Sequence, residues 1–229
     1  MFGKFPISEV AALLADPARV AMLTSLLDGE SRPAGELARM ANVSAQAASA
    51  HLGKLTAAQM LVKARLGRHH YYRLAKPEVG LALEALAVVK SPVKHSMVTQ
   101  SAEVQALRFA RTCYDHLAGR CAVQIAEALM RKQLMNLRTT EFHFTRKGQT
   151  FLQSLGIDPL ALHASRRTFA RACIDWTERR YHVAGSVGAA LLTVFRANDW
   201  IVRRRETRAV RLTSSGRKEL GKLLDVRFD

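Results

Sequence analysis

Apolar side chains recur at helical spacing over the first part of the chain, in short stretches separated by turn residues. Asp16-Pro17 and Asp28-Gly29 interrupt the spacing, and Ser44 is well suited to cap the start of a helix. The pattern predicts five short helices, over residues 7–14, 17–27, 33–41, 45–58 and 78–89.

Between the last two of these helices the apolar pattern changes from helical spacing to alternation. Residues 61–65 and 70–74 alternate on either side of Gly67-Arg68, which predicts a β-hairpin with a glycine at its tip. Basic side chains are frequent on this hairpin. Short helices, a capped helix, a basic hairpin and a closing helix, in that order, are typical of a winged helix-turn-helix domain, here over residues 1–95.

The predicted helix over residues 45–58 has an apolar face and a face of short polar side chains. A DNA-recognition helix needs this division, because one face packs on its domain while the other reaches base edges and phosphates. A basic hairpin beside it would contact phosphates or enter a minor groove. The residues predicted to contact DNA are Ser44, Gln46, Ser49, His51, Lys54, Lys63, Arg65, Arg68 and His69.

The rest of the chain contains an internal repeat. After a predicted linker at 96–101, the segment His116–Gly119 recurs as His182–Gly185, and each copy precedes an apolar helix, a β-prone stretch, a threonine followed by a glycine, and an amphipathic helix. We expect a domain over residues 102–229, built from two degenerate winged-helix-like repeats at about 102–156 and 157–229. The whole chain is then mainly α-helical with small β wings, of the α+β class.

Charge narrows the range of partners. The formal net charge is +16 and the isoelectric point about 10.6, which favours polyanions such as DNA. Neither a secretory signal nor an apolar stretch of about 20 residues is present, so no membrane partner is expected. Three cysteines fit a reducing compartment, and we expect a cytoplasmic protein.

Residues 7–89 resemble the ArsR/SmtB family of winged-helix repressors. The resemblance covers about a third of the chain and lies in the segments Leu14–Arg19, Glu36–Ala38, Val43–Leu55 and Gly67–Leu74. It implies a homodimer that packs through its first and last helices, binds a palindromic operator, and represses transcription until an effector releases it.

The chain departs from the metal sensors of that family. No cysteine lies in the predicted helix over 33–41 and no histidine in the one over 78–89, so neither usual metal site is present. We therefore expect no metal site, no cofactor, and no metal response from residues 1–95. A small-molecule effector of unknown identity remains the expected signal.

Cysteine, aspartate and histidine recur before the two repeat glycines. They can be interpreted as structural residues, as a small-molecule pocket between the repeats, or as a metal or redox centre. If Cys113 and His116 share a helix they could reach one ion, but nine residues separate Cys173 from His182, which argues against a compact metal site. The candidate effector-pocket residues are Cys113, Asp115, His116, Cys173, Asp175, Trp176, Glu178, Arg179 and His182.

The sequence is compatible to different degrees with a repressor, an architectural DNA-binding protein and an enzyme. A sequence-specific, effector-released dimeric repressor accounts best for the capped helix and the basic hairpin. The alternative is an architectural, nucleoid-type protein with weak sequence preference. No G-x-S-x-G, P-loop or H-E-x-x-H motif occurs, so we expect no catalytic residues and no enzyme activity.

Overall fold

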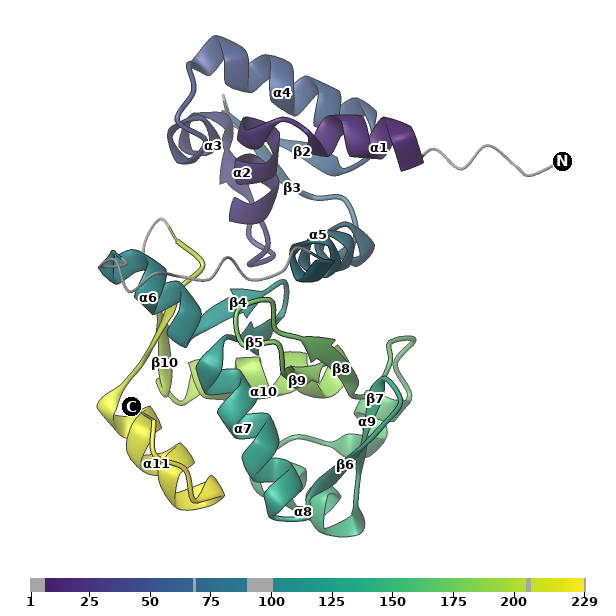
Figure 1. Ribbon diagram of the computed structural model, residues 1–229, viewed down its shortest axis with the longest axis vertical. Helices are drawn as coiled ribbons and strands as arrows, with labels where there is room; N and C mark the ends of the chain where they lie inside the picture. Colours follow the sequence, from purple (N-terminus) through teal and green to yellow (C-terminus); the bar gives the residue numbers. More distant parts are fainter. Residues whose placement is uncertain (1–6, 68, 90–100, 205–206, 229) are drawn as a thin grey trace, which may run out of the picture. The chain divides into compact units, whose positions relative to one another are not determined.

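The computed structural model of the protein describes residues 7–67, 69–89, 101–204 and 207–228. The chain divides into two compact units, Met1–Leu83 and Glu84–Asp229 (Figure 1). The predicted linker at 96–101 lies outside the described residues, apart from Ser101. No helix in the described parts of the chain is long and apolar enough to cross a membrane.

The first unit is a winged helix-turn-helix domain, as predicted. Its elements are α1 (Ile7–Leu14), α2 (Pro17–Ser25), β1 (Arg32–Pro33), α3 (Ala34–Met40), α4 (Ala45–Ala57), β2 (Leu61–Leu66), β3 (His69–Leu74) and the first part of α5 (Pro77–Val89).

Local signals set the helix starts in this unit. The Asp16 side chain accepts a hydrogen bond from the Arg19 amide at 3.0 Å and caps α2, and Ser44 accepts one from the Ala47 amide at 3.2 Å and caps α4. The strands lie in the order β1-β3-β2, and β2 and β3 pair from Leu61–Leu74 to Leu66–His69. The hairpin is therefore the wing, and its base is anchored in the core.

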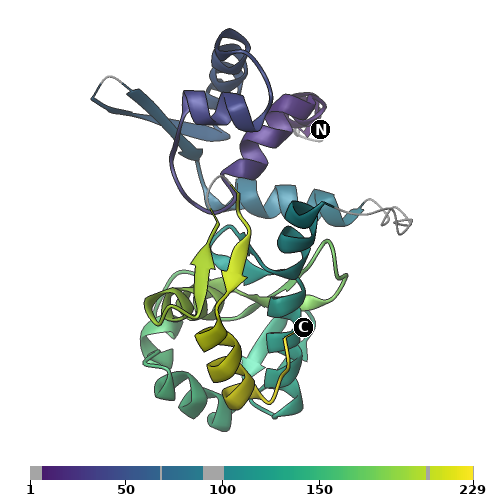
Figure 2. The same ribbon diagram turned by 90° about the vertical axis from the view of Figure 1, so that its left-hand side faces the viewer.

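The second unit repeats one order of elements, strand-strand-helix-strand-strand-helix (Figures 1 and 2). The first set is β4 (Arg111–Cys113), β5 (His116–Ala118), α7 (Arg120–Arg131), β6 (Met135–Arg138), β7 (Glu141–Phe144) and α8 (Arg146–Ser154). The second is β8 (Arg171–Ile174), β9 (Tyr181–Ala184), α10 (Gly185–Ala197), β10 (Ile201–Arg203), β11 (Val210–Leu212) and α11 (Ser214–Leu224). α6 (Ala102–Phe109) precedes the first set, and α9 (Pro159–His163) separates the two. Common descent of the two sets stays a prediction.

One local expectation in this unit is wrong. Cys113 and His116 do not share a helix, because they lie on β4 and β5, a short hairpin whose turn holds Tyr114 at a φ of 57°. A second hairpin, β8–β9, occupies the equivalent place in the second set, and neither hairpin was predicted. All residues of β4 and β5 are buried, so they lack the alternation of polar and apolar side chains that marks a half-exposed strand.

The two sets of elements pack reciprocally. Helix α7 of the first set lies on β9 of the second, and α10 of the second lies on β5 of the first. Strand β7 pairs with β8. A bridge between Arg111 and Ala209 joins β4 to the residue directly before β11. Apolar residues from both sets, including Leu117, Ile125 and Val183, form one continuous core.

Candidate DNA-reading surface and candidate effector site

Helix α4 presents a polar, exposed face in the first unit. Gln46, Ser49 and Lys54 are exposed, whereas Leu52 and Leu55 are fully buried. The apolar face thus holds the helix on the domain. The exposed face is polar, as a helix that reads base edges requires, and contact of these side chains with DNA stays a prediction.

His51 differs from its neighbours on α4. Its Nδ1 atom lies 3.8 Å from the Asp16 carboxylate at the start of α2, and its side chain is only 19% exposed. The ring therefore faces another helix of the same unit. The helical position of His51 did not reveal this, because Asp16 is distant in sequence.

The wing carries an exposed basic edge. Lys63, Arg65 and His69 are exposed, and the Arg65 Nε atom donates a hydrogen bond to the Gly67 carbonyl at 3.1 Å. Arg68, which was predicted to lie at the wing tip, falls outside the described residues. The described part of the wing supplies positive charge without burying it, which suits contacts with phosphates.

Gly53 lies on the exposed side of α4, and a Cβ atom added there would meet nothing within 4 Å. We expect Gly53→Ala to stabilise the first unit by about 0.5–1 kcal/mol, because alanine loses less backbone entropy in a helix. The added methyl group should nevertheless weaken DNA binding, since it thickens the helix where a groove would approach. Thermal unfolding and DNA titration of the same sample measure both effects.

Gly35→Ala is the matched control for this prediction. Gly35 is also an exposed helical glycine with open space around its Cα, but it lies on α3. It should stabilise the unit without a loss of DNA affinity. Equal losses of affinity in both variants would contradict the assignment of α4 as the reading helix.

In the second unit, two hairpins bring the predicted cysteines and histidines together. Cys113 is directly opposite His116 on β4–β5, and Cys173 is directly opposite His182 on β8–β9. Residues opposite each other in an antiparallel pair project to the same face. Cys173 and His182 are nine residues apart because the loop between β8 and β9 is longer than the turn between β4 and β5. Both hairpins therefore present one cysteine and one histidine on the same face.

The Cys/His cluster consists of Cys113, His116, Cys173 and His182, and its donor atoms all lie within 4.8 Å of one another. Each residue is at most 7% exposed. The two Nε2 atoms of the histidines are 3.1 Å apart, and the rings stack at a centroid distance of 5.1 Å. β5 and β9 carry the histidines, so the cluster lies where the two repeats meet.

The protonation of this cluster is strongly perturbed. A hydrogen bond from Cys113 lowers the pKa of the Cys173 thiol, an effect that burial opposes and that hydrogen bonds from both histidines reinforce. The same contact with Cys173, together with burial, raises the pKa of Cys113. Burial opposes protonation of His116, yet hydrogen bonds with Asp115 and Cys173 leave its pKa raised. The two thiols are therefore not equivalent, because their shared contact lowers the pKa of Cys173 and raises that of Cys113.

Asp175 serves as a junction between the repeats. Its carboxylate pairs with Arg111 at 2.8 Å and accepts the Gly119 amide at 2.6 Å, and both side chains of the ion pair are fully buried. It also accepts the amides of Thr177 and Glu178 at 2.9 and 3.0 Å. Burial opposes ionisation, but Arg111 and these hydrogen bonds lower the pKa of Asp175 to about 2. Arg111 was not predicted as a site residue.

The remaining candidate residues each have a contact of their own in the second unit. The Arg111 guanidinium lies 4.8 Å above the Trp176 ring. Arg179 donates a hydrogen bond to the Val88 carbonyl, and Asp115 forms an ion pair with Arg167 at 2.6 Å. Glu178 accepts a hydrogen bond from the Thr177 hydroxyl at 3.2 Å. These contacts fix the turns of the β4–β5 and β8–β9 hairpins, in which Asp115, Trp176, Glu178 and Arg179 lie.

The described residues of the two repeats enclose between them a cavity of ≈ 20 Å³, about the space of one water molecule, which is too small for an organic effector. Its lining comes from both repeats and is apolar: Leu117, Ala122, Ile125, Val183, Gly188, Leu191 and Phe195.

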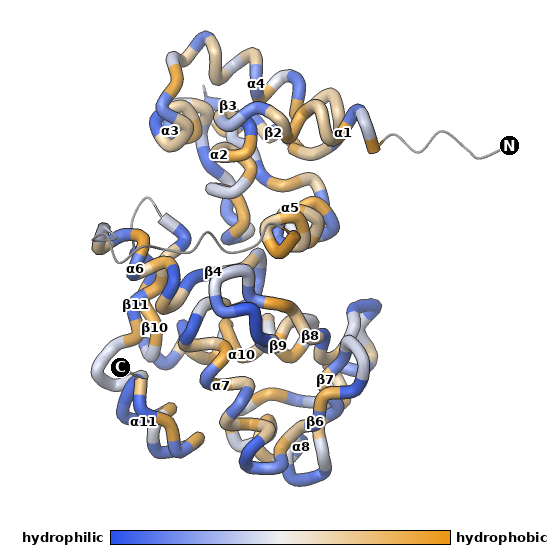
Figure 3. The backbone as a smooth tube through the Cα atoms, in the orientation of Figure 1, coloured by the Kyte–Doolittle hydropathy of each residue, from blue (hydrophilic) through white to orange (hydrophobic). Residues whose placement is uncertain are grey.

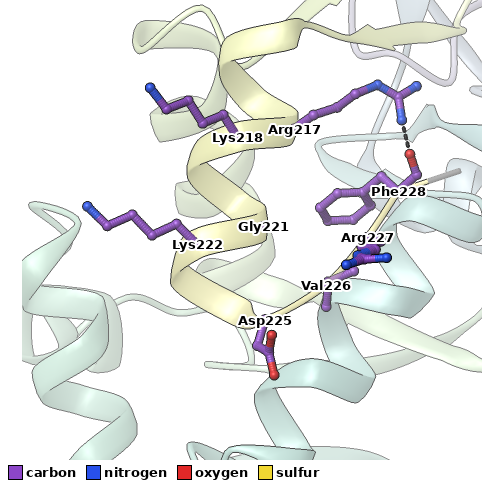
Figure 4. A pocket seen from close by; sticks show the side chains of 8 residues that line it. All are labelled: Arg217, Lys218, Gly221, Lys222, Asp225, Val226, Arg227 and Phe228. Carbon is purple, nitrogen blue, oxygen red and sulfur yellow. Dashed lines mark hydrogen bonds between the residues drawn. The ribbon is translucent and has the colours of Figure 1, made fainter.

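A larger groove of ≈ 780 Å³ lies beside α11 and the C-terminal segment (Figure 4). Arg217, Lys218 and Lys222 project from α11 around it, and Arg217 donates a hydrogen bond to the Phe228 carbonyl. None of the candidate effector residues lines this groove.

Comparison with known proteins supports the assignment of the first unit. Residues 14–63 match the family model HTH_20, a helix-turn-helix domain. The uncharacterized HTH-type transcriptional regulator YdfF of Bacillus subtilis (strain 168) is 42% identical over 222 residues, which are 97% of this chain and 98% of YdfF.

Two solved structures each resemble about two fifths of the chain. A homodimeric winged helix-turn-helix DNA-binding domain from Mycobacterium bovis, described as a possible ArsR-family transcriptional regulator, is 25% identical. It covers 41% of this chain and 87% of its own, with a TM-score of 0.35. NolR from Sinorhizobium fredii is 31% identical, covers 39% of this chain and 92% of its own, and has a TM-score of 0.34.

Proposed function

Because the chain belongs to the family of HTH-type transcriptional regulators, we propose that it is a homodimeric repressor that binds an inverted-repeat operator. An effector that acts on the second unit releases it from DNA. The observation that carries the proposal is the exposed polar face of α4 and the exposed basic wing in the same unit. The opposite face of α4 and the base of the wing are buried in the core of that unit.

Sequence-specific reading is supported by the side chains that α4 exposes. Gln46 offers an amide that can pair with an adenine edge, and Ser49 offers a hydroxyl that can donate or accept. Ala45 and Ala50 are exposed and small, so the backbone of α4 can approach a groove closely. A protein that bound only phosphates would need none of these.

Self-association is supported by apolar side chains left exposed on α1 and α5. Ile7 and Val10 of α1 are 71% and 39% exposed, and Leu86 and Val89 of α5 are 53% and 80% exposed. Figure 3 shows α5 as a largely hydrophobic helix. Burying such side chains against a second copy would remove apolar surface from water. A dimer would also match the two-fold symmetry of an inverted repeat.

Release by an effector is supported by the size and architecture of the second unit. A winged domain reads DNA without such an addition, and the second unit has a core of its own. An effector can shift the equilibrium only if it binds one conformation more tightly than the other.

The alternative function is that of an architectural protein with weak sequence preference, which a net charge of +16 favours. Selection of DNA sequences from a random pool by the full chain separates the two functions. A repressor should enrich an inverted repeat with half-sites one helical turn, or a multiple of it, apart. Light scattering of the complex should give two chains per site. An unenriched pool, or uniform footprints on unrelated DNA, would support the architectural protein instead.

The side chains of α4 and of the wing should contribute in different ways. Gln46→Ala and Ser49→Ala should reduce the ratio of operator to random-DNA affinity by roughly tenfold each, as expected for the loss of one base contact. Lys63→Ala should weaken binding to both DNAs alike and lower the slope of log affinity against log salt by about one unit.

Fluorescence anisotropy at several salt concentrations measures both quantities. Glu78→Ala, on the exposed start of α5, is the control for surface substitutions that touch neither element. An unchanged salt slope in Lys63→Ala would contradict the assignment of the wing to phosphates.

A further inference from the structure

The Cys/His cluster is assembled by pairing across strands in two hairpins that are distant in sequence. Each hairpin presents one thiol and one imidazole on the same face, and the two histidines are separated by 66 residues along the chain. The argument against a compact metal site in this half of the chain rested on the nine residues between Cys173 and His182. Cross-strand pairing makes that count irrelevant, because loop length does not change which side chains face each other.

The distances within the cluster are close to those of a tetrahedral metal site. With metal–sulfur bonds of about 2.3 Å and metal–nitrogen bonds of about 2.0–2.1 Å, donor atoms in such a site lie roughly 3.3–3.8 Å apart. The two Nε2 atoms are already 3.1 Å apart, and no pair of donors exceeds 4.8 Å. A contraction of about 1 Å at the widest pair would complete the tetrahedron.

We propose that Cys113, His116, Cys173 and His182 bind one zinc-class divalent ion in a closed Cys2His2 site that joins the two repeats of the second unit. Two thiolates and two imidazoles are the donor set that zinc takes in structural sites. All four positions are filled by protein side chains, so the ion would hold β5 and β9 together and would leave no position open for a reacting water. The proposal does not rest on the repressor function.

Carboxylates behind both imidazoles support this assignment. The His116 Nδ1 atom is 3.4 Å from an Asp115 oxygen, and the His182 Nδ1 atom is 3.7 Å from an Asp175 oxygen. Histidine ligands of metals usually donate their second N–H to such a group, which fixes the ring and leaves Nε2 for the metal. The arrangement occurs once in each repeat.

Two features of the histidines suit an ion bound between them. The two Nε2 atoms face each other, so one of them can donate only if the other is unprotonated. The buried Nδ1 atom of His182 has no hydrogen-bond partner among the described residues. An ion bound to both Nε2 atoms would place the protons on the Nδ1 atoms, toward the carboxylates.

Charge also favours a divalent ion. A divalent ion with two thiolates and two neutral imidazoles has no net charge, and burying a neutral group costs far less than burying a charged one. Arg111, a fully buried cation of the same unit, is already paired with Asp175. A disulfide between Cys113 and Cys173 would satisfy the sulfurs, but it would leave the two histidines facing each other.

The test uses the full chain, purified under reducing, anaerobic conditions with zinc in the growth medium. Elemental analysis should find one zinc ion per chain. Replacement by cobalt(II) should give the ligand-field bands of a tetrahedral site together with thiolate-to-cobalt charge-transfer absorption. Cys113→Ser and Cys173→Ser should each abolish stoichiometric binding or weaken it at least tenfold.

Cys121→Ser is the matched control. Cys121 is fully buried on α7, burial raises the pKa of its thiol to about 12, and it lies outside the cluster. This variant should keep the ion and the cobalt spectrum. His116→Cys should also keep an ion and should strengthen the charge-transfer band, because a third thiolate then binds.

Several results would overturn the proposal. One is a wild-type protein that takes up no cobalt after full reduction. Another is a cobalt spectrum without thiolate bands, which needs no variant and so does not depend on whether a variant folds. A third is a Cys113–Cys173 disulfide in the anaerobic protein with no bound ion. Failure of operator selection would leave each of these measurements unaffected.

Discussion

Asp175→Ala is expected to lower the free energy of unfolding of the second unit by about 3–5 kcal/mol, the range measured when one partner of a buried ion pair is removed. The Arg111 guanidinium would remain fully buried without its carboxylate. The Gly119 amide would lose an acceptor at the same time. The midpoint of unfolding in urea measures the loss, because a lower midpoint at an unchanged m-value reports a lower free energy of unfolding.

The chain reports this transition by itself. Both of its tryptophans, Trp176 and Trp200, lie in the second unit, so their fluorescence follows that unit. Asp175→Asn keeps an oxygen acceptor but removes the charge, and it should cost less than Asp175→Ala. Glu127→Ala removes a partly exposed ion pair with Arg180 and should cost under about 1 kcal/mol. A loss of that small size in Asp175→Ala would refute a junction role.

Gly185→Ala should destabilise the second unit by at least about 3–4 kcal/mol, among the largest effects expected of a single substitution. Gly185 has a φ of 77°, which side chains disfavour, and a Cβ atom there would lie 2.4 Å from the Thr168 carbonyl oxygen. That oxygen also accepts the Ser186 amide, so it cannot withdraw without breaking a hydrogen bond. Urea unfolding followed by tryptophan fluorescence measures the loss.

Gly156→Ala separates the two causes. Gly156 has the same φ of 77°, but nothing lies within 4 Å of the Cβ position. This variant carries only the conformational cost, roughly 1–2 kcal/mol. If both variants lost the same amount, the close approach to Thr168 would have no energetic consequence and the explanation from crowding would fail.

Much of the first unit could be predicted because its signals are local. The caps at Asp16 and Ser44, the helical spacing of apolar residues and the glycine of the wing each determine structure within a few positions. Helix α4 and the wing strands accordingly lie close to where the sequence placed them. The orientation of His51 toward Asp16 depends on packing between helices, and no local pattern carries it.

The second unit was less predictable because its short hairpins are buried on every side. Arg111 is fully buried in a three-residue strand, although arginine side chains are mostly exposed in proteins. Its partner Asp175 is 64 residues away, so the pair has no local signature. The repeated cysteines and histidines did indicate that those positions matter. Their convergence required knowing that each pair faces across two strands.

The reciprocal strand pairing also constrains how the protein can be synthesised. The Thr112 amide bonds to the Arg208 carbonyl at 2.9 Å, so β4, which pairs with β5 on one side, gains this second neighbour only after residue 208 has been synthesised. Until then a nascent chain carries an open strand edge and an incomplete core, both of which invite association with other polypeptides. Messages truncated before codon 208 should therefore yield a folded DNA-binding unit attached to an insoluble remainder, rather than half of a working second unit.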